Sequence, residues 1–535
     1  MEFVQETFTD EERALLAPHF TDLDGPVFAL LNLPEVVKGA LFARYSRSAK
    51  SLRRLFLDEF LSDEDRERIL TGHDATVSTE RATKLYERVF LEYGDDSVAQ
   101  LGGVHLACEQ SSQLLAKVLE WGRLAAYLEQ STRYVPYDDR PGGRWRYAVP
   151  DEVTAAPELD RRYRATVDAA FETYARWLGP LQAMLADLVP RGPDDSDFVH
   201  RMTVRAKACD ALRGLLPAAT RTNVGIFATA QSYEQLLLRM RAHPLAEVQT
   251  YADLMLTELR KVIPAFLTRV DRPDRGGAWT DYLRKTRRAV AAEAATLLAG
   301  ALPEPRPEVV LTEFDPDGEV KVVAAALYGV GDLPDDQLLA TARRMSADQR
   351  AAVLRAYVGH RTNRRHKPGR AFERTGYRFD VLCDYGAFRD LQRHRTLTVE
   401  WQALSPRHGY EVPPEIEAVG ASDDWVRVMA ESEALYDRLS VAGLADVAPY
   451  AVAMAFRIRF VMQMNAREAM HMIELRTTPQ GHPAYRRVCQ EMHRLIAEEA
   501  GHRAIAEAIS FVDYTSGEQG RLEAERRTAA RRERT

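Results

Sequence analysis

The hydrophobic and polar positions along the chain follow a helical period over most of its length. Thr9 and Glu12 have the spacing of a capping box, so a helix is predicted to begin just after Thr9. Ser346 and Gln349 repeat this signature before the segment AAVLRAYV. Between residues 150 and 300, apolar residues recur at helical spacing in a long alanine-rich stretch with few strand signals. The pattern therefore predicts a helix-rich protein.

The helical pattern breaks at residues 301–308, ALPEPRPE, because three prolines disfavour a continuing helix there. The segment that follows, VVLTEFDPDGEVKVVAAALY, predicts two strands around an Asp-Pro-Asp-Gly turn. We expect an N-terminal domain over residues 1–302 and a C-terminal domain over residues 303–515. The remaining residues, 516–535, form a charged tail, for which a solvated helix is the plain expectation and nucleic-acid contact the alternative.

Composition narrows the class of protein. The chain has 535 residues, a net charge of −7 and 46% hydrophobic residues, which is ordinary for a globular protein and disfavours a dedicated nucleic-acid binder. Its four cysteines are far apart and form no Cys-x-x-Cys pair, so neither a zinc site nor a redox dithiol is indicated. The acidic N-terminus lacks the apolar stretch of a signal peptide, and no run of about 18 apolar residues occurs. We therefore expect a cytoplasmic protein that does not bind membranes.

Residues 390–410, DLQRHRTLTVEWQALSPRHGY, place three cationic or titratable residues next to apolar residues that require burial. The three are Arg393, His394 and Arg395. Cations are costly among apolar side chains unless an anion compensates them. One interpretation is a bound polyanion. The other is a solvent-facing edge on which Asp390 or Glu400 pairs with the cations.

This segment has a counterpart in the first half of the chain. The eleven residues WGRLAAYLEQS (121–131) can be set beside RHRTLTVEWQA (393–403). Both have arginine in the third position and glutamine in the tenth, namely Arg123 and Arg395, and Gln130 and Gln402. Each half also has a later helical segment that ends in an arginine, at Arg241 and Arg476.

These motifs resemble the signature of the flavin-dependent thymidylate synthase family: Arg-His-Arg, seven residues and then serine, usually continuing as Glu-Gln-Ser-Thr-Arg-Tyr. The second half has Arg-His-Arg but places Ala403 where the serine belongs. The first half has EQSTRY at residues 129–134, but Trp121 and Gly122 replace the first arginine and the histidine. A slip of two residues would give the serine and arginine roles in the second half to Ser405 and Arg407. The chain is thus similar to two tandem, diverged copies of this family, over residues 25–275 and 308–510.

Three further segments resemble family elements. NAREAMHMIELR (465–476) is similar to the helix that contacts flavin and nucleotide, and its polar positions fall on Asn465, Arg467, His471 and Arg476. In the first half Ala230 stands opposite Asn465, and only Arg241 is kept. RGLLP (213–217) is similar to a segment whose arginine touches substrate, which implicates Arg213. YGDDSVAQL (93–101) resembles an element that ends in Glu-His, but here Gln100 and Leu101 stand in those places.

The resemblance implies an α+β fold of two tandem helix-rich domains, each with a small sheet. It also implies methylation of dUMP to dTMP, with FAD as cofactor, NADPH and methylenetetrahydrofolate as co-substrates, and no cysteine nucleophile. Arginine is suited to the substrate phosphate because its planar fork binds phosphate through two parallel hydrogen bonds. The implied substrate-binding residues are Gln130, Ser131, Arg133, Arg213 and Arg476, of which Ser131 and Arg476 are also candidate catalytic residues. The implied cofactor-binding residues are Arg393, His394, Arg395, Asn465, Arg467 and His471.

Because each half keeps what the other lost, we expect one composite site. The first half would contribute Ser131, Arg133 and Arg213, and the second the Arg393 cluster and the helix after Asn465. The family forms tetramers with sites between subunits, so a homodimer of this chain would make a pseudo-tetramer that binds nucleotide and folate and no nucleic acid. The alternatives are a regulatory pseudoenzyme that binds flavin or nucleotide, and an RNA binder, which the acidic pI disfavours.

Two further groups of residues indicate less. His493, Glu498, Glu499 and His502 do not share one helical face, so no metal site is predicted from them. The basic segment RTNRRHKPGR (361–370) is expected to be a solvated loop near the flavin site, and a folate or NADPH route or RNA contact is the alternative.

Overall fold

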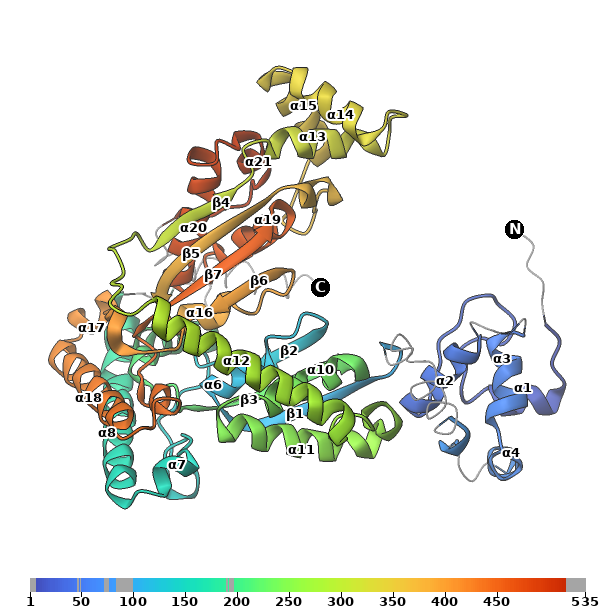
Figure 1. Cartoon of the computed structure of the whole chain (residues 1–535), viewed down its shortest axis with the longest axis horizontal. Coiled ribbons are helices and arrows are strands. Elements are labelled where there is room, and N and C mark those ends of the chain that lie inside the picture. Colours follow the sequence, from blue (N-terminus) through green and yellow to red (C-terminus); the bar gives the residue numbers. More distant parts are fainter. Residues whose placement is uncertain are drawn as a thin grey trace. The chain divides into compact units, whose positions relative to one another are not determined.

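The computed structural model describes residues 6–45, 48, 50–71, 77–82, 100–188, 191 and 197–515. The predicted tail 516–535 and residues 93–99 of the YGDDSVAQL segment lie outside these ranges. Within them the chain is helix-rich and has two small antiparallel sheets, so the predicted α+β class is confirmed (Figure 1). None of the described helices is both long enough and apolar enough to cross a bilayer.

The chain divides into two compact units, each built from several segments. Unit 1 comprises Met1–Glu109, Leu124–Glu129 and Asn223–Ala301, and unit 2 comprises Gln110–Arg123, Gln130–Thr222 and Leu302–Thr535. One division falls between Ala301 and Leu302, beside the domain boundary expected at residue 303. Unit 2 also takes two segments from the first half of the chain. The tandem domains 1–302 and 303–515 stay a prediction.

Unit 1 begins with short helices and ends with longer ones. Its α-helices are α1 (Asp10–Leu16), α2 (Glu35–Tyr45), α3 (Leu52–Leu55), α4 (Asp63–Leu70), α10 (Ala230–Arg241), α11 (Ala246–Val262) and α12 (Ala278–Leu297). The capping box predicted at Thr9 is confirmed, because the Glu12 amide donates to Thr9 Oγ1 at 3.2 Å and the Thr9 amide donates to Glu12 Oε2 at 2.9 Å. The capping box at Ser346 is confirmed in the same way in unit 2.

Unit 2 takes α6 (Gln113–Leu119), α7 (Asp151–Thr154), α8 (Pro157–Leu188) and α9 (Asp197–Leu212) from the first half. From the second half it takes α13 (Gly318–Tyr328), α14 (Asp335–Arg344), α15 (Ala347–Val358), α16 (Tyr385–Leu391), α17 (Pro414–Ala418), α18 (Ser422–Val441), α19 (Ala466–Arg476), α20 (Pro483–Glu498) and α21 (Arg503–Ala508). Its sheet has the order β4-β5-β7-β6. The strands are β4 (Val309–Phe314), β5 (Gly376–Asp384), β6 (Leu397–Trp401) and β7 (Arg457–Asn465).

The hairpin predicted for residues 309–328 is half wrong. Val309–Phe314 is a strand, but the residues after the Asp-Pro-Asp-Gly turn form helix α13. The valines there suggested a strand, whereas three successive alanines and the burial of Val322, Val323 and Ala326 on one side fit a helix better. The sequence pattern also missed a strand between residues 150 and 300, β3 (Arg221–Thr229), whose burial alternates along its length.

The two sheets repeat one another. The first has the order β1-β3-β2, with β1 at Gly103–Ser112 and β2 at Ala125–Glu129, and the second contains the same order as β5-β7-β6. The register also repeats: β2 pairs with β3 from Ala125↔Ala228 to Glu129↔Val224, and β6 pairs with β7 from Leu397↔Met464 to Trp401↔Phe460. This register makes Arg123 and Arg395 equivalent positions of the two repeats, in agreement with the sequence comparison.

The same register corrects one detail of that comparison. It makes Thr229, and not Ala230, the counterpart of Asn465, and both side chains cap the helix that follows. Counted from these caps, Arg476 corresponds to Met240, and Arg241 lies one residue further along because α10 is one residue longer than α19. The likeness of the two terminal arginines is therefore not a structural equivalence.

Within unit 2, equivalent segments of the two halves pair around a local two-fold. The Ala218 amide donates to the Val452 carbonyl at 2.8 Å, and the Met454 amide donates to the Leu216 carbonyl at 2.9 Å. Exchanging the two segments turns each of these bonds into the other. Pro217 and Ala453, which are equivalent, form the β-bridge between them. Such an exchange is the mark of an isologous contact, the kind that two identical subunits make.

Candidate functional site

The two motif segments meet within unit 2. The Gln392 side chain, just after α16, donates to the Lys117 carbonyl in α6 at 2.8 Å. The indole N–H of Trp121 donates to the Val399 carbonyl at 3.3 Å. Arg123 donates to Thr398 Oγ1 at 2.9 Å. Side chains carried by α6, α16 and the loops after them are thereby brought together.

Asp390, in the last turn of α16, is the centre of a buried network of ion pairs. Its carboxylate faces Arg213 at 3.5 Å, Arg393 at 3.8 Å and Arg476 at 3.8 Å. Arg393 also lies 3.7 Å from Glu120, which pairs with Lys117 at 2.5 Å. We call these six residues the Asp390 network. Arg213 comes from the first half and Arg476 from the end of α19, so the network joins both halves.

The charge of Asp390 is fixed by this network. Burial by itself would raise the pKa of Asp390, but Arg393, Arg213 and Arg476 outweigh burial and hold the pKa well below its ordinary value. Asp384, the N-cap of α16, behaves in the opposite way. Its carboxylate accepts from the Ala387 amide at 2.9 Å, and burial raises its pKa to about 6. The pKa values of the two carboxyl groups are therefore shifted in opposite directions, although Asp384 caps α16 and Asp390 lies in its last turn.

Arg133, the arginine of the EQSTRY segment, is almost fully bonded to protein groups. It donates to both carboxylate oxygens of Asp210 at 2.6 and 2.9 Å, to Tyr485 Oη at 2.8 Å and to the Gln480 carbonyl at 3.0 Å. These bonds use four of the five N–H groups of a guanidinium. Arg133 therefore ties the first half to α20, and its bonds to the described residues leave one of its five N–H groups.

The other predicted substrate residues have simple contacts. Ser131 Oγ accepts from the Arg133 amide at 3.2 Å, and the Gln130 carbonyl accepts from Thr222 Oγ1 at 3.2 Å. Arg476 lies with its guanidinium over the Tyr485 ring, 5.5 Å from the centroid. In the second half Ser405 is buried and Arg407 is exposed. Of the predicted substrate residues, Arg213 and Arg476 belong to the Asp390 network.

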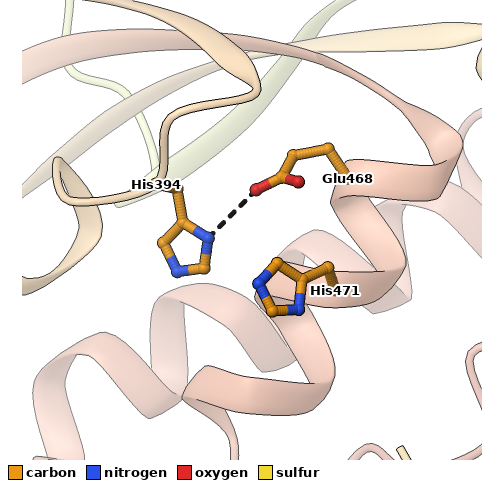
Figure 2. A group of neighbouring side chains, drawn as sticks. All are labelled: His394, Glu468 and His471. Carbon is orange, nitrogen blue, oxygen red and sulfur yellow. Dashed lines mark hydrogen bonds and ion pairs between the residues drawn. The ribbon is translucent and has the colours of Figure 1, made fainter. Parts of the chain in front are cut away.

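The His394 ring lies between the carboxylate of Glu468 and the guanidinium of Arg476. Its Nδ1 lies 3.1 Å from Glu468 Oε1, and Arg476 Nε donates to its Nε2 at 3.0 Å. Because arginine can only donate, Nε2 must be the unprotonated nitrogen, and Nδ1 donates to Glu468 (Figure 2). Burial, with Arg476 adding to it, lowers the pKa of His394 to about 4, so the ring is neutral at pH 7.

Figure 2 shows His394, Glu468 and His471 pointing toward one another, and their ligand atoms all lie within 4.8 Å of one another. Glu468 and His471 are one turn apart on α19, a spacing that metal sites use. Two features argue against a cation here. The Arg476 hydrogen bond leaves the proton of His394 on the nitrogen that faces Glu468. Burial lowers the pKa of His471, and Glu468 acts in the opposite direction. The cations Lys367 and Arg364 lower this pKa further. The group is better suited to hydrogen bonding.

The remaining predicted cofactor residues surround this group. Arg395 is exposed, His471 is half-buried, and Asn465 Oδ1 accepts from the Glu468 amide at 2.9 Å as the cap of α19. Arg467 donates to the Pro368 carbonyl at 3.1 Å. The basic loop 361–370 is therefore in contact with α19. It is also fixed by Arg361, which donates to both carboxylate oxygens of the buried Glu474 at 2.6 and 2.7 Å.

Sequence reasoning missed several members of this site. It treated Asp390 only as a surface partner and did not single out Lys117, Glu120, Asp210, Glu468 or Tyr485. Two of them carried a signal. Lys117 and Glu120 are equivalent to Arg389 and Gln392 in the second half, and all four are buried. A polar residue kept in the same place by both copies of a repeat is a candidate for a buried network.

Comparison with known proteins agrees with this repeat. Residues 41–265 and 310–501 match the family described as thymidylate synthase complementing protein. A UPF0159 protein of Chlamydia muridarum is 37% identical over 526 residues, which cover 98% of this chain and 99% of that protein. A UPF0159 protein of Thermoplasma acidophilum is 30% identical over 91% of this chain and 97% of its own length. A flavin-dependent thymidylate synthase of Mycobacterium avium is 28% identical over 34% of this chain and 66% of its own length.

Proposed function

Because the chain belongs to the thymidylate synthase complementing protein family, we propose that the Asp390 network and the residues around His394 form a nucleotide site for flavin-dependent methylation. The reaction is conversion of dUMP to dTMP, with methylenetetrahydrofolate as the one-carbon donor and NADPH as the source of electrons. The observation that carries the proposal is the network itself, in which Arg213 of the first half and Arg393 and Arg476 of the second half face one buried carboxylate.

The cations of the network support a phosphate ligand. Arg213, Arg393 and Arg476 gather around the carboxylate of Asp390. A phosphate monoester carries nearly two negative charges at neutral pH and would add compensation for such a group of cations. Buried cations are stabilised when an anion compensates them. We assign the phosphate of the nucleotide to Arg213, with the remaining N–H of Arg133 and the Ser131 hydroxyl as further donors.

The residues around His394 fit a flavin cofactor in their donor chemistry. Arg395 and His471 retain exposed surface, and Lys367 adds positive charge beside them, as a pyrophosphate requires. Glu468 is the exception, because its carboxylate would repel an anionic group at the same place. The neutral His394 ring donates a hydrogen bond to it and so stabilises its charge without removing it. Arg395, Asn465, Arg467 and His471 would hold the cofactor. Reduced flavin supplies a hydride when bound.

The role of Arg476 follows from its contacts. His394 accepts from its Nε, and Tyr485 lies under its guanidinium, so its direction is fixed before a substrate arrives. A fixed guanidinium in a site shielded from water stabilises negative charge that develops on a bound base. We propose that Arg476 polarises the uracil so that its C5 carbon attacks the one-carbon donor. Ser131 orients the nucleotide.

Growth of a thymidine-requiring bacterium tests the function. We expect the chain to restore growth without thymidine, Arg213→Gln to fail, and Arg427→Gln to restore growth, because Arg427 is exposed and pairs with Asp424 on its own helix, α18. Purified protein supplied with dUMP, methylenetetrahydrofolate, FAD and NADPH should form dTMP. No growth and no dTMP would reject the proposal.

One observation favours a second candidate, a pseudoenzyme that binds flavin or nucleotide in a regulatory role. Protein groups already use most donors of Arg133, and Ala403 replaces the serine of the second motif. A purified protein that binds FAD and deoxyuridylate but makes no dTMP would select this candidate.

A further inference from the structure

The contacts of Asp390 are looser than those of Asp210, another buried acid in the region. Asp210 accepts two hydrogen bonds from one guanidinium, at 2.6 and 2.9 Å. Asp390 faces three guanidinium groups and approaches none of them closer than 3.5 Å. It therefore serves as a shared counter-charge and does not form a fixed fork with one partner. Contacts of this length lack the short, bidentate geometry that makes the Asp210 pair strong.

Arg213 is the member of the network with spare capacity. Its side chain is buried, yet its Nη2 has no hydrogen-bond partner among the described residues. A buried N–H group without an acceptor costs free energy that a ligand oxygen would recover. The three guanidinium groups that share Asp390 add an electrostatic reason for an anion at this place.

We propose that Asp390 is an internal counter-anion, which holds the arginines of the network together before a phosphate monoester binds and weakens the binding of that phosphate by like-charge repulsion. The identity of the ligand as a nucleotide rests on the proposed function, whereas the competition between carboxylate and phosphate does not. The repulsion makes the site select against inorganic phosphate. Inorganic phosphate alone binds weakly, and a ligand that also places a base over Arg476 and Tyr485 gains enough contact to bind.

The test is Asp390→Asn, which keeps the size of the side chain and removes its charge. Binding of inorganic phosphate and of deoxyuridylate is measured by calorimetry at pH 7.5 and constant ionic strength, together with the melting temperature at each phosphate concentration. Without phosphate the variant should melt at a lower temperature than the native protein. Phosphate should bind the variant at least about tenfold more tightly, the effect of one nearby like charge in a partly screened site. It should also restore the melting temperature.

Asp513→Asn is the matched control. Asp513 pairs with the buried Arg486 at 3.2 Å in the same unit, so its loss also leaves a buried arginine without its carboxylate. That variant should lose stability without gaining affinity for phosphate. If Asp390→Asn does not fold, Arg213→Gln serves in its place, because it removes a cation and should weaken phosphate binding about tenfold in an otherwise native protein.

The outcomes separate this inference from the proposed function. Tighter phosphate binding by Asp390→Asn supports the counter-anion even if deoxyuridylate binds neither protein, a result that would reject only the nucleotide assignment. Phosphate binding that is no tighter in Asp390→Asn than in the native protein, or that is unchanged in Arg213→Gln, overturns the inference.

Discussion

The two repeats share a backbone but differ in charge. Strands β2 and β3 pair in the same register as β6 and β7, and α6 corresponds residue for residue to α16. At the positions equivalent to Asp390 and Arg213, the other copies have Val118 and Pro449. The ion pair between Arg213 and Asp390 is therefore present, and its symmetry-related counterpart has two uncharged residues. Neither of these two positions has a charged residue without its partner. This pattern is physically reasonable because breaking one partner of a buried pair costs more than losing both.

The comparison also shows where the two motif segments differ in side chains. Arg393 and His394 correspond to Trp121 and Gly122, and the Trp121 side chain packs edge-to-face against Trp401. An aromatic side chain therefore stands in one copy where the other has a cation of the Asp390 network.

The largest expected effect comes from Arg133, which ties the first half of unit 2 to α20. Arg133→Ala should lower the free energy of unfolding by about 3–5 kcal/mol, because it leaves Asp210 buried without its partner. Urea denaturation measures this. Arg494→Ala on the same α20 removes exposed ion pairs and should change the free energy of unfolding far less. Equal losses in the two variants would show that Arg133 is not the tie between the halves.

Arg476 and Arg241 test the asymmetry of function. Arg476→Gln should lower kcat about 100-fold or more, an effect near 3 kcal/mol, because it removes a fixed charge from the proposed site. Arg241, at the end of the corresponding helix, pairs with the exposed Asp253 at 3.4 Å, and Arg241→Gln should leave dTMP formation within about twofold of the native rate. Steady-state kinetics decides. A similar loss in both variants would mean that both repeats retain a site.

The helix caps of α6 and α16 differ in charge, and pH exposes the difference. Ser112 caps α6, and its equivalent Asp384 caps α16 with a pKa that burial raises to about 6. An acid whose pKa is raised on folding destabilises the protein when ionised, so its contribution to stability falls as the pH rises from about 4 through 6. Asp384→Asn should therefore gain about 1–2 kcal/mol relative to the native protein at pH 7 and little at pH 4.5.

Urea denaturation of both proteins at the two pH values gives this difference directly. Asp390 does not interfere, because a carboxylate with a lowered pKa stabilises the fold above its unfolded pKa and loses that contribution only at lower pH. A gain of equal size at pH 4.5 and pH 7 would refute the assignment to the charge of Asp384.

The smallest effects are expected at the caps of the two longer helices. Asn465→Ala and Thr229→Ala each remove a side-chain acceptor from the first turn of α19 or α10 and should each cost about 1 kcal/mol of stability. FAD binding, followed by absorbance, separates the two: only Asn465→Ala should weaken it. Loss of stability without any change in FAD binding would leave Asn465 with a capping role alone.

Local chemistry explains which parts of the fold and site could be predicted. The capping boxes at Thr9 and Ser346 depend on residues three apart, and the break at residues 301–308 depends on proline itself, so the sequence contains both signals. The prediction that Arg133 and Arg213 lie close to residues of the second half followed from one observation. Each motif lacks residues that the other has. What failed needed partners far away in the chain. Val322 and Val323 favour a strand until their burial on one face of a helix is known.

The site residues that were missed share this cause. Asp390 reads as a surface acid beside Arg393, and only the approach of Arg213, 177 residues earlier, makes it the centre of a network. The fork between Arg133 and Asp210 likewise fills donors that the motif alone presents as open. A motif shows which side chains are present. Whether their hydrogen-bond donors are still available to a ligand depends on neighbours in space, which the motif does not contain.

The local two-fold at Pro217 and Ala453 has a consequence for synthesis of the chain. Two separate subunits would form an interface of this type when they meet in solution. In this chain residues 214–219 can pair only after residues 450–455 have been synthesised. Until then their main-chain amides and carbonyls lack the partners that complete the core of unit 2. We therefore expect the core of unit 2 to be completed late in translation.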